Sequence, residues 1–242
     1  GPSAEMLEAA AHEAPDLLQA AWSAASMWTA NAATVCPQAD SSDQHLHLSV
    51  ANLSSQLHRS LEARHTEHHL RHIFKGPQMQ VHAALPPVPG LGDEGAANHI
   101  RLCAAHEQPG VQIFVYGKEG QRFAARQSRA ASASIARRHR LSPARCILVS
   151  QSSQAIDAGV FHNDVISVGH RNLLIGHRSA FSDWVELQSL IDNAIATLDR
   201  PFDWRCAIAE DSDFSLGDAV GSYVFNSQLL DEEGGGIWLL GP

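Results

Sequence analysis

A unit of sixty-odd residues that recurs along the chain constrains the fold more than any other feature of the sequence. The clearest copy begins with a strand-like run at 81–85 and a polar turn at 92–99. Two further strand-like runs follow at 100–103 and 111–116, and a helical stretch at about 127–140 closes the copy. Repetition at such a period is typical of arrays in which each unit needs its neighbours to bury its apolar face.

The same pattern can be followed along most of the chain. Asn31, Asn98 and Asn163 occupy equivalent places in successive copies and are spaced 67 and 65 residues apart. Apolar residues at helical spacing, among them Trp184 and Ile191, indicate an amphipathic helix in the later copy. The predicted elements of the other copies are strands 31–35 and 45–50 with helix 60–74, strands 146–150, 165–168 and 173–176 with helix 182–198, and strands 205–209, 222–230 and 237–240.

These copies predict an α/β fold, a closed or propeller-like array of strand–hairpin–helix units that forms a single domain over residues 1–242. The last copy ends on a hairpin with no helix after it, so we expect the array to be incomplete. Residues 1–22 predict a helix that Pro15 interrupts. In such an array the turns beside the strands meet at one end, and we expect the binding cleft there.

Charge and hydropathy exclude several kinds of partner. The chain has 17 Lys and Arg against 26 Asp and Glu, a net charge of −9, and therefore lacks the basic surface that displaces counterions from nucleic acid. No run of eighteen apolar residues and no secretory signal pattern is present. Four cysteines without CxxC spacing are typical of buried thiols in a reducing compartment. We expect a cytoplasmic protein with no nucleic-acid or membrane partner.

Polar side chains gather in four clusters at the ends of strands. Asp93 and Glu94 lie between two glycines, and taken alone this pair is more typical of an acidic turn. His162 and Asp164 are two residues apart before a strand, so on an extended backbone they point to the same side and can face one ligand. The other two clusters contain the pair His58–Arg59 and the single Arg126. An arginine offers a planar fork that suits a carboxylate, although a solvated side chain is the alternative interpretation.

A histidine-rich stretch offers a competing hypothesis, a zinc site. His65, His68, His69 and His72 fall at helical spacing within 60–74, and two histidines one turn apart can bind zinc. No HExxH motif and no suitably placed carboxylate accompany them. A solvated histidine-rich helix is the favoured interpretation, so the sequence predicts no metal site and no cofactor.

Several longer motifs occur in order across essentially the whole chain. They are MWTANAATV (27–35), VANL (50–53), HRSLE (58–62), LGDEGAANH (91–99), FVYG (114–117), ARQSR (125–129), GVFHNDV (159–165) and FNSQLL (225–230). Through them the chain resembles the N-succinylarginine dihydrolase family of the amidinotransferase-like pentein superfamily. The resemblance implies a pseudo-fivefold α/β propeller, in agreement with the repeat. It also implies hydrolysis of N2-succinyl-L-arginine to N2-succinyl-L-ornithine, two ammonia and carbon dioxide in bacterial arginine catabolism.

The same resemblance implies roles for particular residues. Glu94 and His162 match the acid/base pair of the family, while its nucleophilic cysteine belongs to a segment beyond residue 242 and matches none of the four cysteines here. The implied partner is a small-molecule substrate, and exposed unit edges lead us to expect a homo-oligomer. A non-catalytic pentein-type binding module is the alternative. The implied substrate-contacting positions are Asn31, His58, Arg59, Arg126 and Asp164.

Overall fold

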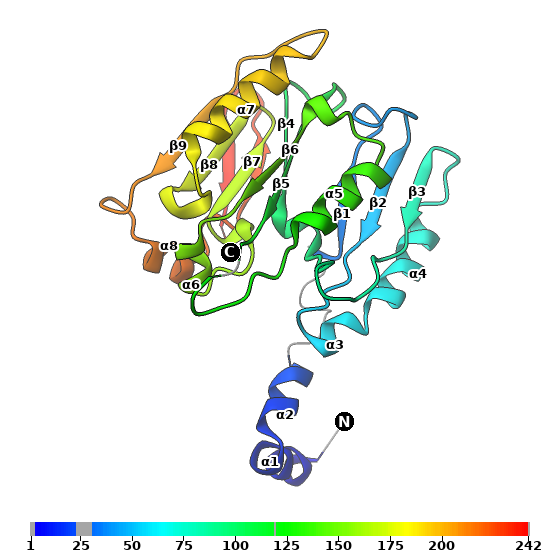
Figure 1. Ribbon diagram of the computed structural model, residues 1–242, viewed down its shortest axis with the longest axis vertical. Helices are drawn as coiled ribbons and strands as arrows, with labels where there is room; N and C mark the ends of the chain where they lie inside the picture. The colour runs from blue at the N-terminus through cyan, green and yellow to red at the C-terminus, as the bar shows by residue number, and fades with distance from the viewer. Residues whose placement is uncertain (1–2, 23–30, 119, 242) are drawn as a thin grey trace.

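The described residues form three three-stranded sheets and one two-stranded sheet, with helices packed against the three larger sheets (Figure 1). The structure is a computed structural model that describes residues 3–22, 31–118 and 120–241. The start of the motif at 27–35 and the first two residues of the predicted N-terminal helix lie outside the described residues. No helix in the described part of the chain is long and apolar enough to cross a membrane.

All three sheets have the same topology. In each, the first two strands form an antiparallel hairpin and the third strand pairs parallel to the second. A parallel partner requires a crossover connection, and in every unit this connection contains a helix of at least ten residues. The units are β1 Ala33–Cys36, β2 Leu46–Val50, α4 Ala63–Ile73 and β3 Met79–His82; β4 His99–Cys103, β5 Gly110–Tyr116, α5 Arg129–Arg138 and β6 Cys146–Ser150; β7 Ser167–His170, β8 Leu173–His177, α7 Trp184–Ala196 and β9 Arg205–Ala209. The predicted repeat is confirmed.

The boundaries between the predicted units are wrong. The strand expected at 81–85 to open a new unit is β3, which closes the first sheet by pairing parallel to β2, with Leu48 opposite Val81. The strands at 146–150 and 205–209 close the second and third sheets in the same way. Because a crossover helix returns the chain to the sheet it left, the strand after each helix belongs to the preceding hairpin.

Helix α7 forms the centre of the largest core. Its N-cap, Asp183, accepts a hydrogen bond from the Glu186 N–H at 2.9 Å, which satisfies one of the free donors of the first turn. Leu187 and Ile191 are fully buried. They belong to one apolar cluster with residues of β5, β6 and β8, so α7 shares its core with both the second and the third sheet. The predicted apolar face of this helix is confirmed.

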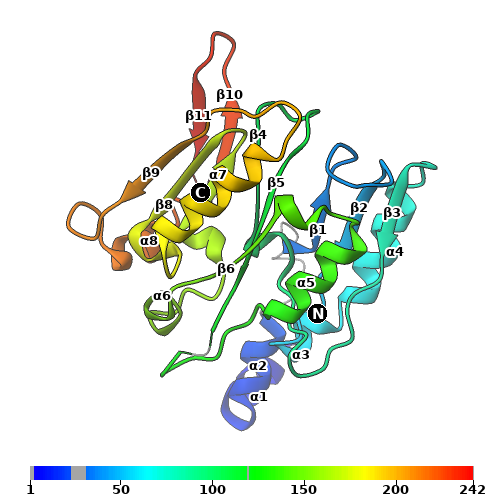
Figure 2. The ribbon, with the colours of Figure 1, turned by 45° about the horizontal axis from the view of Figure 1, so that its top comes forward.

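The remaining elements flank these units. Pro15 separates α1 Ala4–Glu13 from α2 Pro15–Trp22, as predicted. The predicted strand at 222–230 is shorter than expected, because α8 Leu216–Ser222 ends at its first residue and a turn follows before β10 begins at Gln228. A capping box between Ser215 and Asp218 starts α8. Figure 2 shows the hairpin of β10 and β11 projecting at one end of the array. The described sheets do not close into a barrel or propeller. The elements not yet given are α3 Leu57–Ser60, α6 Ser153–Asp157, β10 Gln228–Asp231 and β11 Ile237–Leu240.

Equivalent turns of the units meet one another. Short 3-10 helices, η2 Gly95–Asn98 and η4 Asn163–Val165, lead into β4 and β7. The side chain of Asn98 accepts a hydrogen bond from the Asn163 N–H at 3.0 Å. Gly95 has φ +68° and lies so close to Asn31 that a Cβ would clash with the carbonyl oxygen of that residue. The polar turns therefore converge, as expected from the repeat.

Candidate active site

Glu94 is the centre of a buried hydrogen-bond network. It caps η2, and its side chain is completely shielded from solvent. Its Oε2 accepts from Arg59 Nη2 at 2.8 Å and from His162 Nε2 at 2.7 Å. Burial acts to raise the pKa of this carboxyl, but the hydrogen bond and charge of His162, with Arg59 and Ser55, hold it at about 2. Glu94 is therefore an ionised acceptor at neutral pH.

His162 lies at the start of the 3-10 helix of its own unit, as Glu94 does in the preceding unit. It caps η4 as Glu94 caps η2, and it is buried. The meeting of the turns places its imidazole against the Glu94 carboxylate, although 68 residues separate the two in sequence. A carboxylate on one imidazole nitrogen fixes the orientation of the ring, and a histidine held in this way is suited to proton transfer. The predicted acid/base pair is thus in direct contact.

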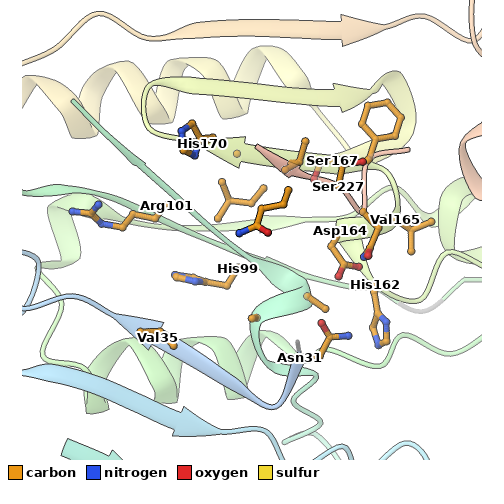
Figure 3. Close-up of a pocket in the computed structure, with 18 of the residues that line it drawn as sticks. Asn31, Val35, His99, Arg101, His162, Asp164, Val165, Ser167, His170 and Ser227 are labelled. Carbon is orange, nitrogen blue, oxygen red and sulfur yellow. The ribbon is translucent and has the colours of Figure 1, made fainter. Parts of the chain in front are cut away.

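Asp164 lies on the same cleft as His162 (Figure 3). Burial raises its pKa to about 6, while the nearby His162 and Asn226 act in the opposite direction. Within the described residues its Oδ1 has no hydrogen-bond partner. An incompletely paired carboxylate of this kind is a receptor for a cation such as a guanidinium, which would supply the missing donors.

The cleft has a volume of about 770 Å³ and lies between the first strands of the three sheets. Asn31, His162 and Asp164 line one end of it, and Arg101 and His170 lie toward the other (Figure 3). Its size is in the range of small-molecule sites. The three sequence-predicted residues that line it therefore come from two different units and face a common space.

The other predicted contacts lie elsewhere. Arg59 is 1% exposed and binds Glu94, so it lies behind the acid/base pair rather than in the cleft wall. His58 lies beside it in α3, and within the described part of the chain neither of its ring nitrogens has a hydrogen-bond partner. The Arg126 guanidinium stacks over the Phe161 ring at 4.1 Å and lines a separate, small pocket. Burial lowers the pKa of Arg126, and the charge of Glu94 opposes that change.

Sequence reasoning missed the residues that hold Glu94 in place. Ser55 Oγ donates to Glu94 Oε1 at 2.6 Å, and the Glu94 N–H donates to Gln127 Oε1 at 2.7 Å. Asn52 Oδ1 accepts from the Asp93 N–H at 3.0 Å. Ser55, Asn52 and Gln127 lie in or beside the predicted polar clusters. The prediction selected the charged residues of those clusters and passed over these three uncharged ones. Short polar side chains next to a predicted strand end were the available signal.

The four thiols do not have the properties of nucleophiles. Burial raises the pKa of Cys36 to about 12 and that of Cys146 to about 11. Burial also raises the pKa of Cys103, which lies on the cleft, and of Cys206. A thiol reacts as the thiolate, and the pKa of an activated cysteine is lowered instead.

Two groups of histidines bear on the metal hypothesis. The four histidines of helix α4 are exposed, as the solvated-helix interpretation predicts. Among the described residues, one group, His106, His170 and Asp231, is compact enough to hold a metal ion. Arg171 already donates to Asp231 Oδ1 at 3.1 Å and places a positive charge where an ion would bind.

Sequence comparisons place the chain among known enzymes. N-succinylarginine dihydrolases of Burkholderia ambifaria and Burkholderia cenocepacia are each 47% identical over 251 aligned residues, which cover 100% of this chain and 56% of theirs. The chain thus spans about half the length of the curated relatives it matches. Among solved structures, the periplasmic domain of PrgH from S. typhimurium aligns with 76% of this chain and 98% of its own at 11% identity. The TM-score of 0.19 is too low to indicate a common fold.

A sequence model of the succinylarginine dihydrolase family matches residues 1–242, the full length of the chain. The motifs that contain Glu94, His162 and Asp164 lie within this match. The chain belongs to the succinylarginine dihydrolase family.

Proposed function

We propose that this protein hydrolyses N2-succinyl-L-arginine to N2-succinyl-L-ornithine, with release of two ammonia and carbon dioxide, in arginine catabolism. The observation that carries the proposal is the contact between His162 and the buried Glu94 carboxylate beside Asp164 on one cleft. A buried ion network of this kind is costly to maintain. It is explained better by proton transfer than by a non-catalytic binding module.

The proposed chemistry divides the work among these residues. A guanidinium carbon is a poor electrophile, so the reaction requires a strong nucleophile and a fixed, planar substrate. Asp164 binds the guanidinium, and the ion pair keeps that carboxyl ionised. His162 protonates the departing ammonia and then removes a proton from the attacking water, while Glu94 orients the imidazole and stabilises its protonated form.

The nucleophile in this proposal is a cysteine contributed by a family segment other than these residues. The raised pKa values of all four thiols described above support that assignment. Asn31, His58 and Arg126 are proposed substrate contacts, and Arg126 offers a guanidinium to a substrate carboxylate. Arg59, which the sequence also led us to expect as a substrate contact, lies behind Glu94 and is proposed to act through that carboxylate.

The proposal extends to assembly and location. The shared topology of the three sheets supports consecutive units of a pentein propeller within a single domain. We place the enzyme in the cytoplasm, where its free thiols remain reduced. We propose a homo-oligomer that acts on a small molecule without nucleic acid.

The test is ammonia release from N-succinylarginine by this chain and by a chimera. In the chimera these residues replace the matching segment of the Burkholderia ambifaria enzyme, whose own activity is the positive control. We expect the chimera to be active and the His162→Ala variant to lose kcat by about a hundredfold or more. A folded but inactive chimera beside an active parent enzyme would refute the proposed function.

A further inference from the structure

The two oxygens of the Glu94 carboxylate have different partners. Oε2 receives both charged donors, Arg59 and His162. Oε1 receives the Ser55 hydroxyl at 2.6 Å, the length of a hydrogen bond strengthened by the charge of the acceptor. A carboxylate can rotate about its terminal torsion, and the donors on its two oxygens fix that rotation.

The Asn52 side chain and a backbone hydrogen bond from the Leu53 N–H to the Asp93 carbonyl at 2.9 Å hold Ser55 in register with Glu94. Asn52 Oδ1 accepts from the Ser54 N–H at 3.2 Å and from the Asp93 N–H at 3.0 Å. The Asn52 Nδ2 donates to the Leu91 carbonyl at 2.7 Å. The residues next to Ser55 and Glu94 in sequence are therefore tied to one buried side chain, so the distance from the hydroxyl to Oε1 does not depend on a flexible loop.

We propose that Ser55 is a positioning residue that fixes the Glu94 carboxylate so that Oε2 remains directed at His162. Without the hydroxyl, Oε1 loses its donor in a site from which solvent is excluded. The carboxylate can then rotate about its terminal torsion, which moves Oε2 away from the imidazole. This inference rests on the proposed function, because it assigns Ser55 to the acid/base pair of that reaction.

The first experiment is kinetic and uses the chimera described above. Ser55→Ala is compared with Ser55→Thr, which keeps a hydroxyl, and with Ser54→Ala, which removes a neighbouring hydroxyl that does not contact Glu94. We expect Ser55→Ala to lower kcat about tenfold with KM nearly unchanged, because the lost interaction acts on the chemical step. Ser55→Thr should recover most of the activity, and Ser54→Ala should match the unaltered chimera.

The second experiment needs no activity and uses this chain alone. Carbon-detected NMR follows the titration of the Glu94 carboxyl in the unaltered chain and in Ser55→Ala. A hydrogen bond to the ionised form lowers a carboxyl pKa, so its removal should raise the Glu94 midpoint by about one pH unit. Ser54→Ala should leave the midpoint in place.

The outcomes separate the two proposals. An inactive chimera would overturn the proposed function, while the NMR titration would still test the role of Ser55. An active chimera in which Ser55→Ala leaves kcat unchanged, or raises only KM, would overturn the positioning role. An unchanged Glu94 midpoint in Ser55→Ala would overturn it as well.

Discussion

The buried pair of Arg59 and Glu94 permits a quantitative test of the site's energetics. The perturbation is Arg59→Met, which keeps the apolar stem and removes the guanidinium. Arg59 is 1% exposed and Glu94 0%, with 2.8 Å between Nη2 and Oε2. A surface ion pair contributes less than about 1 kcal/mol. Breaking a buried pair costs about 3–5 kcal/mol, because the remaining charge is left in a low-dielectric site.

We expect the free energy of unfolding to fall by about 3 kcal/mol in Arg59→Met. The value lies at the low end of the range because His162 and Ser55 still bind the carboxylate. Glu94→Gln in the same background removes the stranded charge, so the double variant should recover about 1–2 kcal/mol relative to the sum of the single variants. Urea unfolding of the parent, the two single variants and the double variant at neutral pH gives the four free energies of unfolding that the comparison needs.

Two results would refute this reasoning. If the effects of the two substitutions are additive within about 0.5 kcal/mol, the residues do not interact energetically. If Arg59→Met costs less than about 1 kcal/mol, water reaches the site and the pair behaves as a surface pair.

Three further substitutions test other parts of the structure. Burial raises the pKa of Asp93 to about 7. As pH rises from about 4 to about 7, this carboxyl ionises in the unfolded chain but stays protonated in the folded one, so its contribution lowers the free energy of unfolding. Asp93→Asn should therefore gain stability relative to the parent between pH 5 and pH 8, and an equal difference at both pH values in urea unfolding would contradict the assignment. Gly95→Ala should cost about 2 kcal/mol or more, since its φ is +68° and the added Cβ meets backbone. A melting temperature within about 2 °C of the parent would argue against that strain. Ile191→Ala should lower the free energy of unfolding by about 2–5 kcal/mol. Val185→Ala, on the exposed face of the same helix, should change it by less than about 0.5 kcal/mol. Equal effects would rule out the buried face described for α7.

The repeat and most of its strands were predictable because period and apolar pattern report directly on burial. The strands at 146–150, 205–209 and 237–240 have the predicted bounds. The partner of each strand was not predictable in the same way, since nothing in the local pattern of β3 states whether it pairs with the hairpin before it or after it. Parallel pairing is set by the crossover helix, a long-range property.

The candidate site shows the same limit. Glu94 and His162 could be named from the motifs that contain them, but their mutual contact depends on how two equivalent turns meet across units. The role of Arg59 as a partner of Glu94 also became visible only in three dimensions. Ser55 and Gln127 carry no charge, and their importance comes from the buried acceptor and donor that they satisfy.

The unequal cores of the units have a consequence for hydrogen exchange. The largest cluster joins the second and third units through α7, whereas the buried residues of the first sheet form a separate small cluster around Leu48, Val50 and Val81. Local opening should therefore require the least free energy in the first unit, and its amide hydrogens should exchange with solvent before those of the other units. Arg59 and Ser55 belong to the first unit, which should exchange early. Glu94 and His162 belong to the second and third units, which should exchange late. The carboxylate at the centre of the site thus lies on the boundary between two cooperative folding units.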